Sequence, residues 1–190
     1  MALDVNALQE RFGLIEEIAV LTCISNPVGG PLVGNSRWTG PRLADVLASA
    51  RPRCSARSAV FVSADGYSVT VPLFRLRDAR NLLALGQNGQ PLTRDHGAPC
   101  RARIPALYGM MNAKWLERIS LVAGMPEGYW ALRGWSRTGE VRTESRIDVA
   151  PAAPRAGQPE AIAGVAWAGE RGISRVEVST DGGAPGARPG

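Results

Sequence analysis

The chain has 190 residues, 45% of them hydrophobic, enough to bury the core of one domain plus a smaller second piece. No stretch approaches the roughly 18 consecutive apolar residues of a membrane span, and the acidic amino-terminal run argues against a signal peptide. The net charge of +5 comes almost wholly from arginines, which are scattered in short runs. We therefore expect a soluble protein with no nucleic acid partner.

The first predicted element is a strand over residues 15–22, where apolar and polar side chains mix and the run ends at Cys23. The sequence NPVGGPLVGN that follows is dense in Gly, Pro and Asn, which is typical of a loop. Pro41 then opens a short helix, because apolar residues recur at helical spacing from there to residue 50.

A β-hairpin over residues 58–73 is the clearest element, since two β-rich runs flank the turn dipeptide Asp65-Gly66. A further strand is expected at 81–85. After it come an irregular segment, 91–113, and a β-rich run, 114–122.

Residues 151–160 are rich in Pro, Ala and Gly and indicate a domain boundary. We expect an α+β domain over 1–148 and a second, incomplete domain over 149–190. The runs 161–169 and 173–180 of that second domain each read as a strand, and together as its first hairpin.

The three cysteines, Cys23, Cys54 and Cys100, are odd in number and show no C-x-x-C spacing. This argues against a zinc ribbon and against a disulfide framework. Cys23, beside an unusual loop sequence, is then a candidate metal ligand or nucleophile, and the alternative is an inert packing cysteine.

Three segments carry a family resemblance: LTCISN with NSRWTGPRLADVL, then NGQPLTRDHGAPCRARIP, then YGMMNAKWLERI. Their order and spacing resemble the sulfite oxidase family of molybdopterin enzymes from about residue 18 to 150. The tail resembles the start of the immunoglobulin-like dimerisation domain of relatives. The resemblance implies mixed sheets with short helices, a truncated β-sandwich-like tail and a possible homodimer of the intact protein.

The resemblance also implies a molybdenum-molybdopterin cofactor, with Cys23 as the protein's ligand to the metal and Asn26 beside it in the C-x-x-N segment. A soft thiolate suits a metal that cycles between oxidation states, and a bound metal keeps the thiol deprotonated. Cys54 and Cys100 are then bystanders.

A pterin that bears a phosphate needs cations and directional donors. The family's His-Gly-x-Pro-x-Arg segment is present with His96 and Arg101, and the chain's single lysine, Lys114, stands at the family's lysine position. The backbone of Asn112 and Ala113 is expected to supply N–H donors.

Two assignments keep an open alternative. Asp65 matches an aspartate that contacts the pterin in relatives, but an Asp-Gly turn favours aspartate for its own sake. Arg37 is expected in the cofactor or substrate pocket, and otherwise is a structural arginine.

Three departures from the family concern substrate and extent. Val28 stands where sulfite-oxidising relatives carry an arginine, and Trp135 stands where they carry a tyrosine. The substrate is therefore expected to be something other than sulfite, with Trp135 lining its pocket. The loop after Cys23 is similar to the bacterial branch fused to membrane helices, and the family's upstream pterin-contacting segment has no counterpart in MALDVNALQERFGL.

The sequence thus predicts a molybdopterin-dependent oxidoreductase that transfers an oxygen atom or two electrons with a small molecule such as a sulfoxide or N-oxide. Two alternatives stay open: a non-catalytic remnant that keeps the fold without the cofactor, and a thiol enzyme in which His96 activates Cys23.

Overall fold

The computed structural model describes residues 1–27 and 29–183, and its contacts divide the chain into two compact units. The first unit is Met1–Val141 and the second is Arg142–Gly190. The sequence places the run SRIDV at the end of the first domain, but the contacts group that run with the residues that follow it. The reason is pairing, because SRIDV forms a strand whose partner lies in the second unit.

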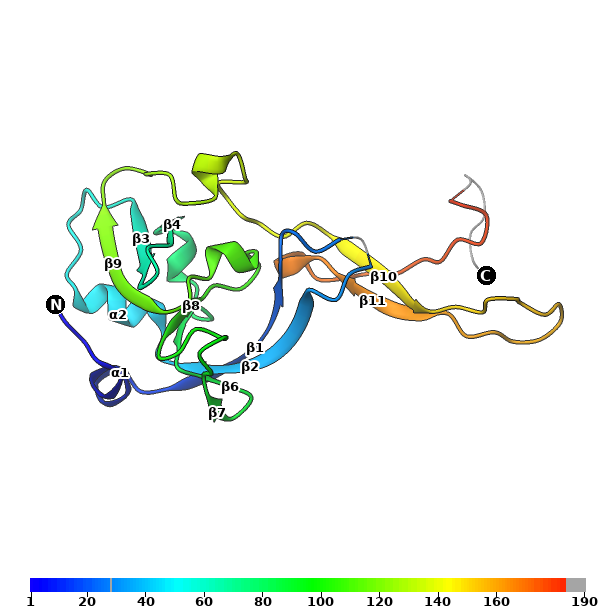
Figure 1. The fold of residues 1–190 in the computed structure, drawn as a ribbon, viewed down its shortest axis with the longest axis horizontal. Coiled ribbons are helices and arrows are strands. Elements are labelled where there is room, and N and C mark those ends of the chain that lie inside the picture. Colours follow the sequence, from blue (N-terminus) through cyan, green and yellow to red (C-terminus); the bar gives the residue numbers. More distant parts are fainter. Residues whose placement is uncertain (28, 184–190) are drawn as a thin grey trace. The chain divides into compact units, whose positions relative to one another are not determined.

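Both units are built from short elements (Figure 1). The helices are α1 (Val5–Phe12), α2 (Leu43–Ser49) and the 3₁₀ turns η1 (Arg75–Arg77), η2 (Gly109–Met111), η3 (Ala131–Arg133) and η4 (Gly169–Arg171). The strands are β1 (Ile15–Thr22), β2 (Val33–Gly40), β3 (Ser58–Ser63), β4 (Ser68–Pro72), β5 (Leu82–Ala84), β6 (Gly86–Gln87), β7 (Gln90–Pro91), β8 (Arg101–Arg103), β9 (Leu116–Val122), β10 (Glu144–Val149) and β11 (Ala163–Trp167). These mixed sheets with short helices confirm the α+β prediction.

The strands of the first unit form three antiparallel sheets, ordered β1-β2-β6-β7, β4-β3-β9 and β5-β8. β1 is an edge strand of the first sheet. Its register pairs Ile15 with Gly40 and Thr22 with Val33, so the loop of residues 23–32 closes the hairpin. Cys23 is therefore the first residue beyond the last pair of the ladder.

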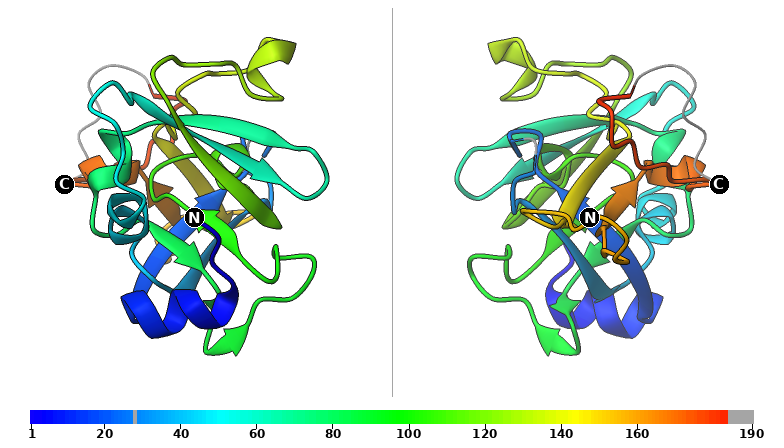
Figure 2. Two further views of the ribbon diagram at one scale, coloured as in Figure 1. Left: turned by 90° about the vertical axis from the view of Figure 1, so that its left-hand side faces the viewer. Right: turned by 90° about the vertical axis from the view of Figure 1, so that its right-hand side faces the viewer.

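Several predicted elements are confirmed. β1 has the predicted bounds, and α2 follows Pro41 with Leu43, Val46 and Leu47 buried on one face. The β3–β4 hairpin turns at Asp65-Gly66, where Gly66 has φ +85° and Tyr67 N–H donates to Asp65 Oδ1 at 3.0 Å. Figure 2 shows this hairpin, in teal, across the first unit from α1, in dark blue.

Other elements differ from the predictions. α1 was not predicted, although Asp4 caps it by accepting from Ala7 N–H at 2.8 Å, a contact worth about 1 kcal/mol. The predicted loop after Cys23 ends sooner than expected, because β2 begins at Val33.

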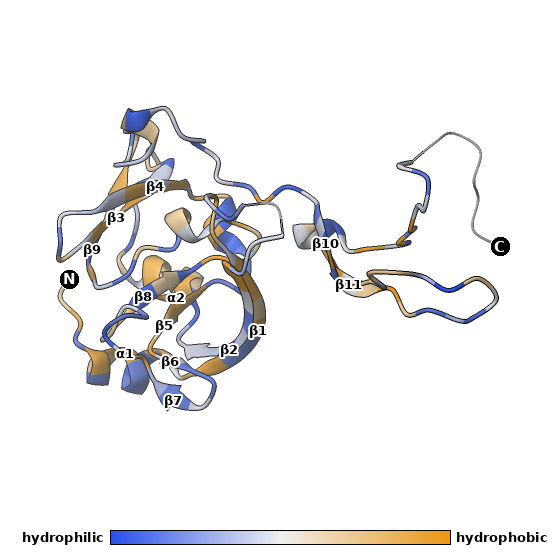
Figure 3. Ribbon diagram, turned by 45° about the vertical axis from the view of Figure 1, so that its right-hand side comes forward, coloured by the Kyte–Doolittle hydropathy of each residue, from blue (hydrophilic) through white to orange (hydrophobic). Residues whose placement is uncertain are grey.

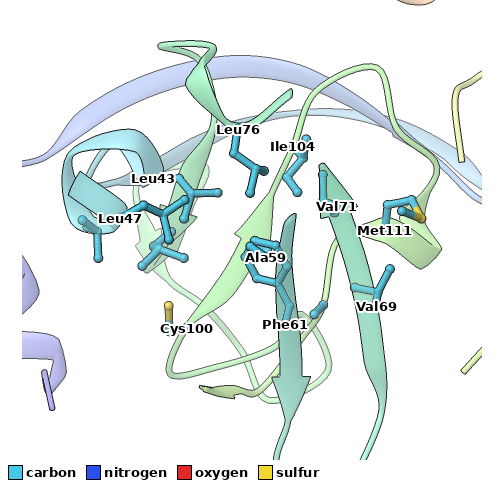
Figure 4. Packing of buried hydrophobic residues seen from close by; sticks show 14 of the residues in the cluster. Leu43, Leu47, Ala59, Phe61, Val69, Val71, Leu76, Cys100, Ile104 and Met111 are labelled. Atoms are coloured by element: carbon cyan, nitrogen blue, oxygen red, sulfur yellow. The ribbon is translucent and has the colours of Figure 1, made fainter. Parts of the chain in front are cut away.

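One apolar core ties β3, β4 and β9 to α2 and the β8 segment, and Figure 3 shows hydrophobic residues following these strands. Figure 4 shows side chains of this core, which include Leu43, Leu47, Ala59, Phe61, Val69, Val71, Leu76, Cys100, Ile104 and Met111. Cys100 is thus a packing residue. No helix among the described residues is long and apolar enough to cross a membrane.

The second unit, as far as it is described, centres on the antiparallel pair β10–β11, with Glu144 opposite Trp167. The predicted hairpin between 161–169 and 173–180 is wrong, because β11 pairs with β10 and residues 173–180 form no strand. Alternating β-branched residues favour a strand only where a partner offers backbone hydrogen bonds.

Candidate functional site

Cys23 is held by its backbone where β1 gives way to the loop of residues 23–32. Its N–H donates to Leu32 O at 2.9 Å, and its carbonyl accepts from Asn26 N–H at 3.1 Å. The side chain is half-buried, and the sulfur lies 3.0 Å from Ser25 Oγ. The thiol is thus fixed in place yet open to a ligand.

Asn26 folds this loop back on itself, because its Oδ1 accepts from Leu32 N–H at 2.9 Å. Gly30 lies so close that a Cβ there would stand 2.4 Å from Asn26 Oδ1. The predicted cofactor residue Asn26 therefore shapes the loop beside Cys23. Val28, on which the predicted change of substrate partly rests, lies outside the described residues.

Arg101, in β8, is only 4% exposed and joins two parts of the predicted pterin site. Its Nη1 donates to His96 O at 2.9 Å, and its Nη2 donates to Asn112 O at 3.3 Å. The guanidinium carbon lies 5.1 Å from the centre of the Trp38 ring, within cation–π range. The fold thus brings three of the predicted residues together.

His96 and Lys114 lie toward the surface of the same segment. His96 Nδ1 lies 2.7 Å from Thr93 Oγ1, while Lys114 Nζ donates to Asp95 O at 2.9 Å. A Cβ on Gly97 would stand 2.9 Å from Lys114 Cβ, so the two stretches of backbone approach this closely only because residue 97 is glycine.

The Asn112 side chain is engaged in several hydrogen bonds. Its Oδ1 accepts from Ile104 N–H at 2.6 Å, and its Nδ2 donates to Leu107 O and Tyr108 O at 3.2 and 3.0 Å. Its backbone N–H donates to Gly109 O at 3.0 Å rather than toward a ligand. Ala113 O accepts from Ala102 N–H at 2.9 Å, which pairs this stretch with β8.

Arg103 belongs to the same site, and the sequence analysis missed it. It is fully buried; its Nη1 donates to Asn112 Oδ1 at 3.2 Å and its Nη2 to Val20 O at 2.6 Å. Its guanidinium carbon lies 5.6 Å from the Trp38 ring centre. The signal depends on β8, which lies in the segment predicted to be irregular: once residues 101–103 form a strand, Arg101 and Arg103 share a face.

Asp65 borders a hollow of about 510 Å³, and among the described residues that line it, Asp65 is the one predicted cofactor residue. The hollow is lined by Ala64, Asp65, Arg94, Ala98, Pro99, Trp115, Leu116 and Glu117. Its walls therefore come from the hairpin turn, the His96 loop and the start of β9. Asp65 also stabilises the hairpin turn, as the alternative interpretation of this residue expects, because its Oδ1 accepts from Tyr67 N–H.

Arg37 and Trp135 lie elsewhere in the unit. Arg37 is exposed, with Nη1 3.9 Å from Glu16 Oε2, and alternation along β2 points it away from the face on which Trp38 meets Arg101. The Trp135 ring lies edge-on to Trp130 at 5.9 Å. Among the contacts of the described residues, none joins Arg37 or Trp135 to Cys23 or Arg101.

The buried charge at the Trp38 face is positive and unbalanced. Burial lowers the pKa of Arg101 to about 10. The pKa of Arg103 is also lowered to about 10, first by burial and second by the nearby positive charge of Arg101. Both guanidinium groups therefore stay charged at neutral pH. Within residues 1–27 and 29–183 neither arginine pairs with a carboxylate, and Nε of each, like Thr22 Oγ1, is buried without a hydrogen-bond partner. Uncompensated buried cations fit an anionic ligand such as a pterin phosphate.

The other two cysteines lie in different surroundings from Cys23. Burial raises the pKa of the Cys100 thiol to about 12, so at neutral pH it stays protonated inside the core. Cys54 is exposed in the segment between α2 and β3. Of the three cysteines Cys23 is the half-buried one, and it follows β1, whose Val20 carbonyl accepts from Arg103.

Two buried cations that have no carboxylate partner among the described residues, one of which binds the strand that leads to a half-buried cysteine, fit a site for an anionic ligand. The family described as "oxidoreductase molybdopterin binding domain" matches residues 1–130. The chain belongs to this family, and its cofactor is molybdenum-molybdopterin.

Named relatives agree with the family, and a solved structure shares the fold. The chain is 36% identical over 181 residues to mitochondrial sulfite oxidase of Mus musculus, covering 80% of this chain and 33% of that protein. It is 32% identical over 103 residues to the uncharacterized oxidoreductase YuiH of Bacillus subtilis, covering 54% of this chain and 52% of that protein. The sulfane dehydrogenase SoxCD of Paracoccus pantotrophus shares the fold, with a TM-score of 0.71 and 22% identity over 87% of this chain and 49% of that one. The chain spans about a third of the length of the mammalian sulfite oxidases that it matches.

Proposed function

We propose that this chain holds the cofactor of a molybdenum-molybdopterin oxidoreductase that transfers an oxygen atom or a pair of electrons. One observation carries the proposal: the buried, unpaired guanidinium of Arg101 lies between His96 and Asn112, in the segment that bears Lys114. A buried cation without a carboxylate is expensive unless an anion completes the site.

In this proposal Cys23 binds the metal through its thiolate, while Arg101, Lys114 and His96 hold the phosphate and pterin. When bound, molybdopterin supplies a metal that changes oxidation state and exchanges oxygen. The chain's own residues hold and orient the cofactor, and the loop shaped by Asn26 sets where the Cys23 sulfur lies. Asp65, in the hairpin turn that borders the hollow, would contact the pterin.

The substrate in this proposal is a small organic oxygen donor or acceptor, such as a sulfoxide or an N-oxide, rather than sulfite. Val28 offers no charge where sulfite-oxidising relatives carry an arginine. Trp135 offers a donor-only indole in place of a tyrosine hydroxyl. Trp135 and Arg37 are assigned to the substrate pocket in this proposal, although among the described residues no contact joins either side chain to Cys23 or Arg101.

Assembly is part of the same proposal. The resemblance of residues 149–190 to a dimerisation domain supports a homodimer of the intact protein, which passes electrons to or from a separate redox partner. The similarity of the loop after Cys23 to membrane-fused relatives supports tethering of the parent protein to a membrane.

Metal and pterin analysis of protein made in a molybdenum-replete host tests the proposal. We expect about one molybdenum per chain; Cys23→Ser should lose activity, because the metal loses its protein ligand, but should keep its pterin, because the phosphate anchors remain. Cys54→Ser and Cys100→Ser are the matched controls and should stay active. Equal loss from Cys54→Ser would overturn the assignment of Cys23, and a wild-type chain free of pterin would favour a non-catalytic remnant.

A further inference from the structure

Arg103 has an unusual position for an arginine. It is fully buried in β8, it pairs with no carboxylate among the described residues, and its Nε has no hydrogen-bond partner. Replacing such a charge by an apolar side chain of similar volume is often neutral or favourable for stability. Packing alone therefore gives no reason for an arginine at this position.

Its two hydrogen bonds join two separate parts of the site. Nη2 donates to Val20 O at 2.6 Å, and Nη1 donates to Asn112 Oδ1 at 3.2 Å. The backbone carbonyl of Asn112 in turn accepts a hydrogen bond from Arg101. The guanidinium of Arg103 therefore connects the strand that leads to Cys23 with the segment that holds Arg101.

The Val20 contact matters because β1 is the edge strand of its sheet. An edge strand presents backbone groups that no neighbouring strand satisfies. Arg103 satisfies one such carbonyl three residues before Cys23, and a Cβ on Gly109 would lie 3.5 Å from Thr22 O, so the η2 turn also packs against this end of the strand.

We propose that Arg103 is a positioning residue that holds the Cys23 end of β1 against the segment of Arg101, Asn112 and Lys114. It fixes the spacing between the metal-binding thiol and the phosphate-binding cations. This positioning role, called the clamp below, rests on the hydrogen bonds of Arg103 to Val20 and Asn112. Its consequence for cofactor binding rests on the proposed function.

Hydrogen exchange of the apo chain tests the clamp directly. Arg103→Met should speed amide exchange of residues 20–23 about tenfold, because a bond from a charged donor is lost, and should leave the first half of β1 nearly unchanged. Arg103→Lys keeps the charge and one donor and should restore part of the protection. Val71→Ala, a core truncation in β4, is the control for general loss of stability.

A double-mutant cycle on pterin release tests the consequence. Arg103→Met should raise the rate of pterin release about tenfold when Cys23 is present, and less than about twofold in the Cys23→Ser background, because Arg103 acts through the position of Cys23. Arg101→Ala should raise the rate in both backgrounds.

The outcomes separate this inference from the proposed function. Unchanged exchange at residues 20–23 in both Arg103 variants, or equal effects of Arg103→Met on release with and without Cys23, would overturn the positioning role. A wild-type chain that carries no pterin would refute the proposed function and the cofactor consequence, while the exchange experiment still decides whether Arg103 clamps β1.

Discussion

The two halves of the candidate site are built in opposite ways. The loop of residues 23–32 is largely exposed and is held by backbone hydrogen bonds and one amide, that of Asn26. The anchoring segment, residues 96–114, is tied together by the buried guanidinium groups of Arg101 and Arg103 and by the Asn112 side chain.

This difference suggests a division of labour. Buried charges that lack a carboxylate partner are preorganised for an anion, so under the proposed function the anchoring segment would supply affinity for the cofactor. A loop with few buried contacts tolerates sequence change, so the loop beside Cys23 is where substrate preference can vary between relatives.

The largest expected effect is on the choice of substrate, if the loop beside Cys23 determines it. Sulfite should be turned over poorly, since losing charged contacts of about 1.5–3 kcal/mol each lowers specificity roughly a hundred- to a thousand-fold. Steady-state assays of the intact protein with sulfite and an artificial acceptor, beside a sulfoxide panel in the reductive direction, measure this. Val28→Arg should raise kcat/KM for sulfite, with Trp135→Phe as a control that adds no charge. Robust sulfite oxidation by the unchanged protein would mean that another cation, such as Arg37, binds the anion.

Cofactor retention should instead follow the anchoring segment. Lys114→Ala should lower molybdenum content several-fold with little change in apo Tm, because Lys114 is half-buried and its amine, among the described residues, contacts Asp95 O and the Trp115 ring. Arg101→Ala should lower both the molybdenum content and the apo Tm. It should cost about 1–3 kcal/mol of stability, because the carbonyls of His96 and Asn112 lose their donor. Unchanged cofactor content with a collapsed Tm in Lys114→Ala would show that the lysine is structural.

Much of this site was predictable because its residues stand in motif order. Cys23, His96, Arg101 and Lys114 are recognisable by type and spacing, and the fold brings the last three into one segment. Arg103 was missed because motif spacing says nothing about an extra arginine; only the two-residue period of a strand reveals that it shares the face of Arg101.

The errors in the fold have two different physical origins. α1 was missed because its capping aspartate, Asp4, was not recognised as a helix start. Residues 173–180 were expected to be a strand because their composition fits one, but composition does not name a partner, and β10 takes that place beside β11. Local pattern predicts which segments can be strands, and pairing decides which of them are.

A milder change in the loop sharpens the comparison. Gly30→Ala places a Cβ 2.4 Å from Asn26 Oδ1 and 2.7 Å from Pro27 Cδ, so both must shift; the lost bond from Leu32 N–H alone costs about 1 kcal/mol. We expect a small drop in Tm and a larger drop in molybdenum content, because the loop carries Cys23. Gly34→Ala, where a Cβ would meet nothing within 4 Å, is the control. A fall in Tm without loss of metal would separate the loop from cofactor binding.

The smallest expected effect concerns Tyr67, which joins the β3–β4 hairpin to the anchoring segment by donating to Met110 O at 2.5 Å. Tyr67→Phe removes that bond and should cost about 1 kcal/mol at neutral pH, read from urea unfolding of the apo protein. Burial, and then the charge of Asp65, raise the pKa of Tyr67 to about 12 from an ordinary value near 10. A group whose folded pKa is raised contributes stability that is complete below its unfolded pKa and lost as pH rises through the folded pKa. The stability difference between wild type and Tyr67→Phe should therefore hold up to about pH 10 and shrink toward pH 12. A difference that stays constant to pH 12 would mean that the Tyr67 hydroxyl is not buried against Met110 as the structure shows.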